Sequence, residues 1–398
     1  MNILLITRTG MNRLSENDFY LNEVSGSDEV PELPTTQSQH FWVEALRDNG
    51  HQVTVERYTD SQLVSPQRRA AFDRKLKGLT SLGFAAYRKG SRSIPQRLNP
   101  EIRARNERIV SNAIAADPEL VLITGGYTQL FPHTIERIKA VTGATIAGTC
   151  GVGPFDYSNA CEREIAVKYY DFAFTNTSHR TQAWRALGVN AVQLPVSGCA
   201  PAFAKAVKET DERFTADVSF VGQPYPRRVM YFEQLPDVDV ALYGPGWDET
   251  PLAEYHRGEA WGKERIKAIY NSKISLNVHH RCSGYGGNMR LFEIPVAGTM
   301  QIVDTYDPDW YEEGDEIVSV ETPEEMRDTV EYYLNNDEKR NRIAEQGHER
   351  AKRDHNYHQR MEQLVSIVAN DGGVPDGVVD TKYIEKYAAT PHWSDPVK

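Results

Sequence analysis

The chain of 398 residues lacks the long apolar runs and the paired cysteines that mark several common protein classes. Its longest early apolar run, from Ile3 to Ile6, is far shorter than a signal-peptide core of roughly 7–15 residues. No stretch approaches the roughly 20 apolar residues of a membrane-spanning helix. The four cysteines stand singly and are Cys150, Cys161, Cys199 and Cys282. These absences argue against a zinc site and predict a cytoplasmic protein with reduced thiols.

Four motifs that carry common chemistries are also missing from the sequence. The segment TRTGMNR follows the first predicted strand, where a dinucleotide-binding protein would have GxGxxG. The phosphate-loop pattern GxxxxGK[ST], the metalloprotease pattern HExxH and the hydrolase pattern GxSxG do not occur. Dehydrogenase, P-loop ATPase, zinc protease and serine hydrolase functions are therefore disfavoured.

What the chain does have is the composition of a globular protein and an uneven distribution of charge. Apolar residues make up 40% and charged residues 25% of the sequence, and the length favours two domains. The net charge is -11, but residues 67–109 hold twelve Lys and Arg against three acids. That segment therefore carries +9 and the remainder -20. A local excess of this size indicates an anionic partner.

Strand and helix patterns alternate through both halves of the chain. In the first half, predicted strands at 2–7, 119–126, 144–149, 172–177 and 191–195 alternate with helical patterns. In the second half, predicted strands at 217–223, 238–244, 274–280, 299–304 and 316–320 do the same. Such alternation is typical of parallel sheets covered by helices on both faces. We expect an α/β protein of two Rossmann-like domains that face each other across a cleft.

The clearest candidate ligand site is the stretch GYGGNMRLFEIPVAGT, residues 284–299. It follows a predicted strand, and a helix is expected to begin near Asn288. Glycine allows a ligand to approach the backbone, and the N–H groups at a helix start suit a phosphate, with Arg290 adding charge. Glu293, one turn further on, could accept two hydrogen bonds from a ribose diol. The alternative interpretation is a helix start with Glu293 paired to a nearby arginine.

A second strand ends in the segment FVGQPYPRR, residues 220–228. Arg227 and Arg228 follow its glycine turn, and two guanidinium groups at the end of a neighbouring strand can bind a diphosphate. The alternative is a pair of exposed arginines at the start of a surface helix. The segment DPD, 307–309, could be mistaken for a metal-binding motif, and we interpret it as a surface turn.

Residues 215–365 resemble the carboxyl-terminal domain of GT-B glycosyltransferases of the spore-maturation, family 1 and 4-like group. The resemblance is carried by FEIPVAG, the GDEI turn, the helix YYLNNDEKR and the ending HNY. It is weaker in the first half, where it is carried by ELVLITGG and YYDFAFTNTSHRTQAWRALG.

The resemblance implies an acceptor-binding domain at 1–200, a nucleotide-sugar-binding domain at 201–365 and a tail, 366–398, that packs back on the first domain. It also implies a UDP- or GDP-sugar donor, a glycan or lipid-linked acceptor, no tightly bound cofactor and no required metal. The residues implied to bind the donor are Gly222, Arg227, Arg228, Gly287, Asn288, Met289, Arg290 and Glu293. The segment 256–262 lies where related enzymes hold the nucleobase.

The residues that would carry the reaction are less clearly marked. Many retaining relatives have a second glutamate eight positions before the ribose-binding one, where this chain has Tyr285, so the stereochemistry stays open. Asp156 is the best-placed acid for a general base, although it could instead cap the helix that follows. His279, at the end of a predicted strand, is the second catalytic candidate, and either it or His280 is expected to be only packed.

More than one interpretation remains for the role of the basic segment 67–109 and for the activity of the protein. Phe72, Leu76 and Leu79 lie among the basic side chains and favour an amphipathic helix on an anionic membrane surface, with a solvated helical face as the alternative. Nucleic acid is disfavoured because the aromatic residues form no stacking pattern and the chain is acidic. For the activity, a nucleotide-sugar 2-epimerase of the same fold and a non-catalytic sugar-binding or assembly protein remain alternatives.

Overall fold

The computed structural model describes residues 1–7, 37–57, 98–124, 130–150, 154, 160–280 and 287–370. It divides into two compact units. The first consists of Met1–Phe174 and Ala183–Val192, and the second of Thr175–Gln182 and Gln193–Lys398. The domain limits at residues 200 and 365 stay predictions, and the tail beyond residue 370 lies outside the described residues.

The first unit is built on a six-stranded sheet in the order β2-β1-β3-β4-β5-β6, and the pairings from β2 to β5 are parallel. Its strands are β1 (Asn2–Thr7), β2 (Gln52–Arg57), β3 (Leu120–Thr124), β4 (Thr145–Thr149), β5 (Phe172–Thr175) and β6 (Ala191–Gln193). Its helices are α2 (Gln37–Asp48), α5 (Pro100–Ala116), α6 (Pro132–Thr142), α7 (Ala160–Tyr169) and α8 (Ser178–Ala186), the last of which runs across the boundary between the units. The strands β1 and β3 are buried almost throughout, as expected for a sheet covered on both faces.

The second unit is built on a five-stranded sheet in the order β11-β10-β9-β7-β8, also with parallel pairings. Its strands are β7 (Ala216–Val221), β8 (Val240–Tyr243), β9 (Ser272–Asn277), β10 (Met300–Val303) and β11 (Val318–Ser319). Its helices are α9 (Pro201–Val207), α10 (Pro226–Phe232), α11 (Lys263–Tyr270), α12 (Met289–Ala297), α13 (Pro323–Leu334), α14 (Asp337–Asp354) and α15 (Tyr357–Ala369). Three short 3-10 turns complete it: η2 (Glu212–Phe214), η3 (Trp247–Glu249) and η4 (Ala253–Tyr255).

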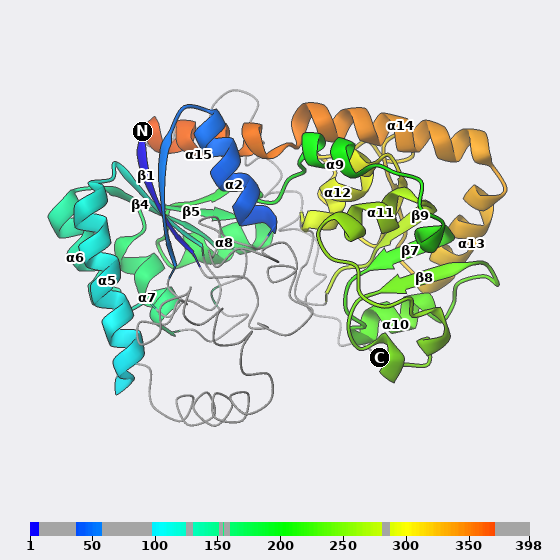
Figure 1. The fold of residues 1–398 in the computed structure, drawn as a ribbon, viewed down its shortest axis with the longest axis horizontal. Coiled ribbons are helices and arrows are strands. Elements are labelled where there is room, and N and C mark those ends of the chain that lie inside the picture. The colour runs from blue at the N-terminus through cyan, green and yellow to red at the C-terminus, as the bar shows by residue number, and fades with distance from the viewer. Residues whose placement is uncertain are drawn as a thin grey trace, which may run out of the picture. The chain divides into compact units, whose positions relative to one another are not determined.

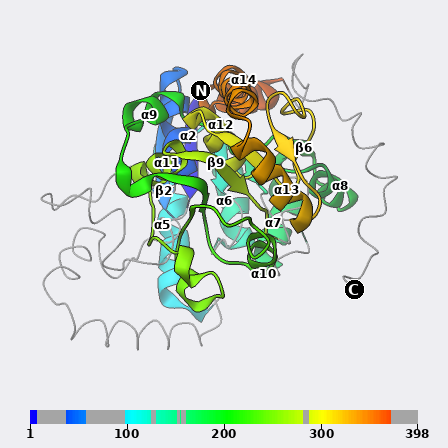
Figure 2. The same cartoon turned by 90° about the vertical axis from the view of Figure 1, so that its right-hand side faces the viewer.

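Two hydrophobic clusters lie on opposite faces of this second sheet. One is formed with residues of α9, α11 and α12, and the other with residues of α10 and α13. In Figure 1, β7 to β9 lie between α11 and α12 above and α10 below. The turned view of Figure 2 shows α10 and α13 on the opposite side of β9 from α11. The arrangement is a three-layer α/β sandwich.

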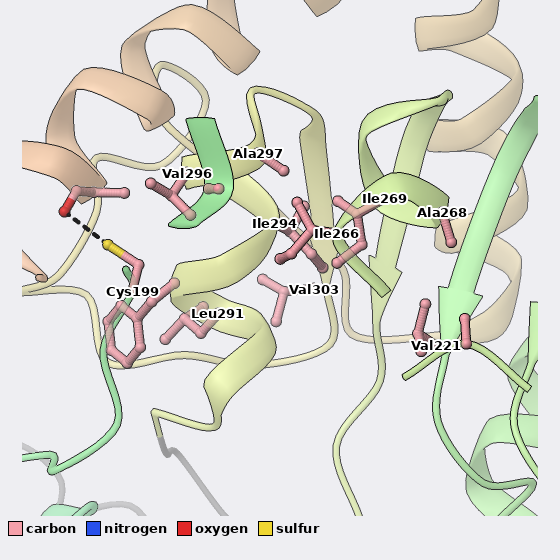
Figure 3. Packing of buried hydrophobic residues seen from close by; sticks show 14 of the residues in the cluster. Cys199, Val221, Ile266, Ala268, Ile269, Leu291, Ile294, Val296, Ala297 and Val303 are labelled. Carbon is pink, nitrogen blue, oxygen red and sulfur yellow. Dashed lines mark hydrogen bonds between the residues drawn. The ribbon is translucent and has the colours of Figure 1, made fainter. Parts of the chain in front are cut away.

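The helix that contains the candidate ligand site is held firmly in the first of these clusters. Along α12, Leu291, Ile294 and Val296 are buried, and Figure 3 shows Ile294 packed toward Ile266 and Ile269 of α11. Cys199 lies beside them, and its thiol donates to the carbonyl of Ala351 at 3.3 Å. The helix begins at Met289 and ends before Gly298 in the left-handed conformation, at the limits that the sequence predicts.

Candidate functional site

The strand order of the second sheet reverses between β7 and β9, the position at which an open parallel sheet is expected to have a ligand-binding crevice. From β7 the chain adds β8 on one side and then crosses to β9 on the other side. In open parallel sheets, ligands bind beyond the carboxyl ends of the two strands at which the order reverses. Here these strands are β7 and β9. The segments that follow them hold Gly222, Arg227, Arg228 and His279, and α12 starts shortly afterwards.

The start of α12 is organised by Asn288. Its Oδ1 accepts a hydrogen bond from the Leu291 amide at 2.9 Å, and its Nδ2 donates to Asn277 Oδ1 at 2.8 Å. In a helix the first N–H groups have no carbonyl acceptor within the helix, so the amides of Met289 and Arg290 are suited to an anion. Gly287 precedes them, and a Cβ there would lie 2.9 Å from the Trp310 ring. The glycine is therefore required by close packing at the helix start.

Two arginines converge on this crevice from different elements. Arg290 donates to the Val221 carbonyl at 3.1 Å and to Asn277 at 3.2 Å. Arg228, which is buried, donates to the carbonyls of Val278 at 2.8 Å and Gln223 at 2.9 Å. Burial lowers the pKa of Arg228 to about 10, and burial together with repulsion from Arg228 lowers the pKa of Arg290 to about 9. Burial is the main cause of both lowered pKa values, and the nearby acids Glu293 and Asp304 only partly offset it at Arg290.

Arg228 is thus not one of two exposed arginines on a surface helix. Two of its N–H groups are engaged by backbone carbonyls, and its guanidinium lies over the rings of Phe220 and Tyr225 at 5.0 and 4.7 Å. It holds the loop after β7 to the end of β9. Arg227 is the more accessible of the pair, with 39% of its side chain exposed.

Arg227 and His279 meet at an acid that the sequence analysis missed, Asp304. One carboxylate oxygen accepts from the His279 amide at 3.0 Å and lies 2.7 Å from His279 Nδ1. The other accepts from Arg227 Nε at 3.1 Å. Burial opposes ionisation of Asp304, but His279 and Arg227 outweigh it and hold the pKa of the carboxyl below its usual value. His279 itself is buried, and the geometry identifies Asp304 as the group that orients its ring.

Glu293 lies one turn into α12 and is 5% exposed. Its Oε1 accepts from Arg265 of α11, so the predicted alternative of an arginine partner describes one side of this carboxylate correctly. Its Oε2 is buried and has no hydrogen-bond partner among the residues that the structure describes. Burial raises the pKa of Glu293, while Arg265 and Arg290 oppose that rise. A buried carboxylate oxygen without a partner is costly, which points to an acceptor for a ligand hydroxyl.

Gly222 and Gly244 bring the ends of β7 and β8 together. Gly222 donates to the Tyr243 carbonyl at 2.8 Å, and its own carbonyl accepts from Trp247 Nε1 at 2.7 Å. Gly244 has φ +132°, and a Cβ there would lie 2.5 Å from the Gly222 carbonyl oxygen. Only glycine allows this approach of the two loops.

Several predicted residues fall elsewhere. Asp156 and Tyr285 lie outside the described residues, as do positions 67–97 of the basic segment. The interpretation of 307–309 as a surface turn was wrong for its first acid. Asp307 is 3% exposed and accepts from Gln193 Nε2 at 2.8 Å, because the turn folds inward against the segment that follows β6.

Three residues that contribute to the candidate site had a weak signal in the sequence or none. Asp304 ends the predicted strand 299–304, and an acid at the carboxyl end of a parallel strand could have drawn attention to it. Arg265 lies inside an ordinary amphipathic helix, and Asn277 inside an apolar strand. Neither position predicts a contact with Glu293 or Asn288.

Within the ranges that the structure covers, no cluster of three or more His, Cys, Asp or Glu side chains has the geometry of a metal site. No helix in those same ranges is long and apolar enough to cross a membrane.

Comparison with known proteins places this geometry in a family context. Residues 227–366 match the family model described as "Glycosyl transferase-like". No curated protein sequence matches the chain. Among solved structures, similar ones include Alr3699/HepE from Anabaena in complex with UDP and glucose, with a TM-score of 0.58, 9% identity, and coverage of 93% of this chain and 100% of the other. A glycosyltransferase from Rickettsia africae ESF-5 has a TM-score of 0.59, 11% identity, and coverage of 93% and 98%.

The chain has the GT-B fold. Two parallel sheets, each flanked by helices, agree with the expected α/β class. A further similar structure is a protein from Listeria monocytogenes described as a "putative UDP-N-acetylglucosamine 2-epimerase", with a TM-score of 0.51, 14% identity, and coverage of 93% of this chain and 96% of the other. Arg227, Arg290, Glu293 and Asp304 all lie within residues 227–366, the stretch that is similar to the "Glycosyl transferase-like" family model.

Proposed function

We propose that the protein is a glycosyltransferase that moves a sugar from a nucleotide-diphosphate sugar to an acceptor. The observation that carries this proposal is the carboxylate of Glu293. One oxygen is held by Arg265, and the other is buried without a partner among the described residues, one turn behind the start of α12. That oxygen is suited to the hydroxyls of a ribose. HepE, a protein of the same fold, has been solved in complex with UDP and with UDP-glucose.

The charges around Glu293 support a donor that carries a diphosphate. The start of α12 directs its positive end and its first amides into the crevice, and Arg290 lies in its first turn. Arg227 extends from the neighbouring loop with its side chain partly exposed. In this proposal these groups neutralise the leaving diphosphate, so that transfer needs no bound metal. Activity that persists in excess chelator would support that part, and activity restored only by a divalent cation would contradict it.

The residue roles follow from these positions. Glu293 binds the ribose, the amides after Gly287 and Asn288 bind the diphosphate, and Arg290 and Arg227 provide positive charge. Arg228 holds the loop that carries Arg227, because its own N–H groups are engaged by backbone carbonyls. His279, oriented by Asp304, stays the candidate for contact with the donor near the transferred sugar.

Nucleotide binding is the experiment that tests the donor site. Thermal-shift measurements with UDP, GDP, ADP and dTDP should show stabilisation by one of them, because a ligand that binds only the folded state raises the melting temperature. A flat response to all four would contradict the proposal and favour the non-catalytic alternative. Glu293→Ala should then weaken calorimetric binding of the active nucleotide, and unchanged affinity would refute the ribose role.

Asp156 remains the proposed general base for an acceptor hydroxyl. Asp156→Ala should abolish sugar transfer and leave nucleotide affinity unchanged, whereas near-normal turnover would remove it from the mechanism. The two measurements separate a catalytic role from a role as a helix cap, since loss of a cap lowers stability by about 1 kcal/mol without this selectivity.

A 2-epimerase is the second candidate, and it is favoured by the Listeria protein of the same fold. An epimerase acts on the nucleotide sugar alone, so incubation of UDP-sugars without acceptor distinguishes the two. Formation of an epimer in that assay would replace the transferase proposal. Transfer that depends on an added glycan or lipid-linked acceptor would support it.

The basic segment 67–109 keeps its separate prediction of contact with an anionic membrane surface. Flotation with liposomes that contain or lack anionic lipid, repeated at high salt, tests it. Binding that needs anionic lipid and disappears in salt is expected. Equal flotation with neutral liposomes would contradict it.

A further inference from the structure

A cavity of about 310 Å³ lies in the second unit, away from the crevice between β7 and β9. Its walls come from the segment after β6, the turn after β10, the end of α14 and the start of α15. Its lining combines two arginines, Arg350 and Arg360, with two acids, Asp309 and Asp354, and with His355 and three glutamines, Gln193, Gln359 and Gln363. This cavity is not lined by any of the described residues that we assigned above to binding of the donor.

The most unusual group in this wall is Arg360, which is 5% exposed. Its Nη2 donates to His355 Nδ1 at 2.9 Å, and its Nη1 is 3.5 Å from Gln363 Oε1. Its guanidinium carbon lies 5.7 Å from the centre of the Phe292 ring. Its Nε has no hydrogen-bond partner among the described residues. Its hydrogen-bond and ring partners are therefore all uncharged, and Asp354 favours its charged form without forming an ion pair with it.

His355 cannot supply a negative charge, and its tautomer is set by its neighbours. Its Nε2 lies 2.7 Å from the Trp310 carbonyl, which can only accept, so Nε2 carries the proton and Nδ1 accepts from Arg360. Burial, together with the charge of Arg360, lowers the pKa of His355 to about 3. The ring is neutral at physiological pH, and it directs the guanidinium without balancing it.

The second arginine of the cavity, Arg350, differs from Arg360 because a carboxylate neutralises its charge. Arg350 donates to the carbonyls of Trp310 at 3.1 Å and Asp309 at 3.2 Å, and it forms an ion pair with Asp354 at 3.2 Å. Arg360 has no such ion pair within the described part of the chain. Burial lowers the pKa of Arg360 only to about 10, so it remains a cation at neutral pH. A buried cation is costly unless an anion accompanies it.

We propose that this cavity is a second ligand site, which binds the phosphate or carboxylate group of a small polar molecule on Arg360. The guanidinium has unused N–H donors and lies in the first turn of α15, where the helix dipole also favours an anion. The amides of Gln193, Gln359 and Gln363 provide donors and acceptors for the uncharged part of the ligand. The volume is at the lower end of small-molecule sites, which corresponds to a single sugar phosphate or sugar acid. This second site does not depend on the proposed donor site, so each of the two proposals can be refuted without the other.

Calorimetry on the full chain, in the presence of saturating UDP to occupy the donor site, tests the proposal. The probes are inorganic phosphate, glucose 1-phosphate, glucuronate and neutral glucose. Arg360→Gln removes the charge. Gln363→Glu places a carboxylate beside the guanidinium and supplies internally the anion that the ligand would bring. Lys205→Gln removes one exposed positive charge from α9 and serves as the matched control.

Binding of glucose 1-phosphate or glucuronate, weakened at least tenfold by both cavity variants and unchanged in Lys205→Gln, is the expected result. Preference between the two probes identifies phosphate or carboxylate as the group recognised. Gln363→Glu should also raise the melting temperature without ligand, which shows that the variant is folded and that the charge was unbalanced. Equal affinity in wild type and both cavity variants, binding of glucose alone, or no binding of any probe to the wild type would overturn the proposal.

Discussion

The starts of α12 and α15 are alike in sequence but differ in their charge environment. Each helix follows an asparagine whose side chain accepts a backbone amide, Asn288 at one and Asn356 at the other. Each has an arginine in its first turn, Arg290 and Arg360. Near Arg290 lie the acids Glu293 and Asp304, which favour its charged form. Arg360 makes its direct contacts with a neutral histidine, an amide and an aromatic ring, and Asp354 favours its charged form without an ion pair.

This difference separates two kinds of ligand site. A crevice with both acids and arginines can bind a molecule that carries hydroxyls as well as phosphates, as a nucleotide does. A cavity with a buried arginine that has no ion pair is suited to the anionic group of a ligand. The same helix-capping residues therefore serve two chemistries, and the surrounding strands and loops decide which.

Among substitutions that test the difference between the two helix starts, we expect those at Glu293 to have the largest effect on stability and on nucleotide binding. Glu293→Ala leaves Arg265 buried without its partner and should reduce stability by about 3–5 kcal/mol. The double variant Glu293→Met with Arg265→Met replaces both charges with apolar side chains and should recover most of that stability. Because the ribose acceptor is still missing, UDP affinity should stay at least about tenfold below wild type. Chemical denaturation and calorimetry measure the two quantities.

The exposed pair Glu349–Lys352 provides the control for that experiment, since Glu349→Ala should cost less than about 1 kcal/mol and leave UDP binding intact. Recovery of both stability and UDP affinity in the double variant would show that Glu293 is only the partner of Arg265. The α12 start would then lose its distinction as a nucleotide site.

Asp304 should produce the next largest effect, with a characteristic pH dependence. Its pKa is lowered in the folded protein, so its contribution to stability is present above its unfolded pKa and is lost as the pH falls through the folded value. Asp304→Asn should reduce the free energy of unfolding by about 2–3 kcal/mol at pH 7. Wild type and variant should converge as the pH falls below the ordinary Asp value. A constant difference between pH 7 and pH 3 in thermal unfolding would contradict the ion pairs with Arg227 and His279.

The contribution of Asp307, which lies beside the α15 cavity, to the free energy of unfolding should depend on pH in the opposite direction. Burial raises its pKa to about 6, so stability falls as the pH rises from its ordinary value of 3.8 toward 6. A shift of about two units corresponds to about 3 kcal/mol at neutral pH, and the Asn variant loses one hydrogen bond of about 1 kcal/mol. Asp307→Asn should therefore stabilise the protein by about 1–2 kcal/mol at pH 7 and not at pH 4. Lower stability of the variant at both pH values would show that its hydrogen bonds outweigh its buried charge.

The smallest effects should come from the two caps themselves. Asn356→Ala and Asn288→Ala should each cost about 1 kcal/mol, the usual loss for a helix N-cap. Only Asn288→Ala should also weaken UDP binding, because only that helix start faces the proposed diphosphate. Paired denaturation and UDP titrations check this, and equal UDP affinity in both variants would remove the functional difference between the two helix starts.

The elements of the fold were largely predictable from the sequence. Strands such as 2–7 are short apolar runs bounded by polar loops, and α12 and α13 end where a left-handed glycine or an asparagine was available. The limits of shorter elements shifted, and β8 spans Val240–Tyr243 where 238–244 was expected. The first and last residues of a strand are set by its pairing with neighbouring strands. The sequence pattern of one segment therefore does not determine them.

The candidate site was predictable only where a chemical group stands in a distinctive local pattern. Glu293 and Asn288 belong to one helix start and could be identified together. Asp304 and Arg265 come from separate elements, and their partners became visible only when the sheet brought β7, β9 and β10 side by side. The inward turn at Asp307 was misjudged because DPD is a common surface pattern, and nothing local shows that Gln193 lies against it.

The sequence by itself determined the alternation of strands and helices, the helix start at Asn288 and the acid one turn behind it, because periodicity and capping are local properties. The tertiary structure decided which arginines carry an unbalanced charge. Arg228, Arg290 and Arg360 are equivalent as letters in a sequence. Their surroundings differ because the fold places Glu293 and Asp304 near Arg290, whereas the hydrogen-bond partners of Arg360 are neutral.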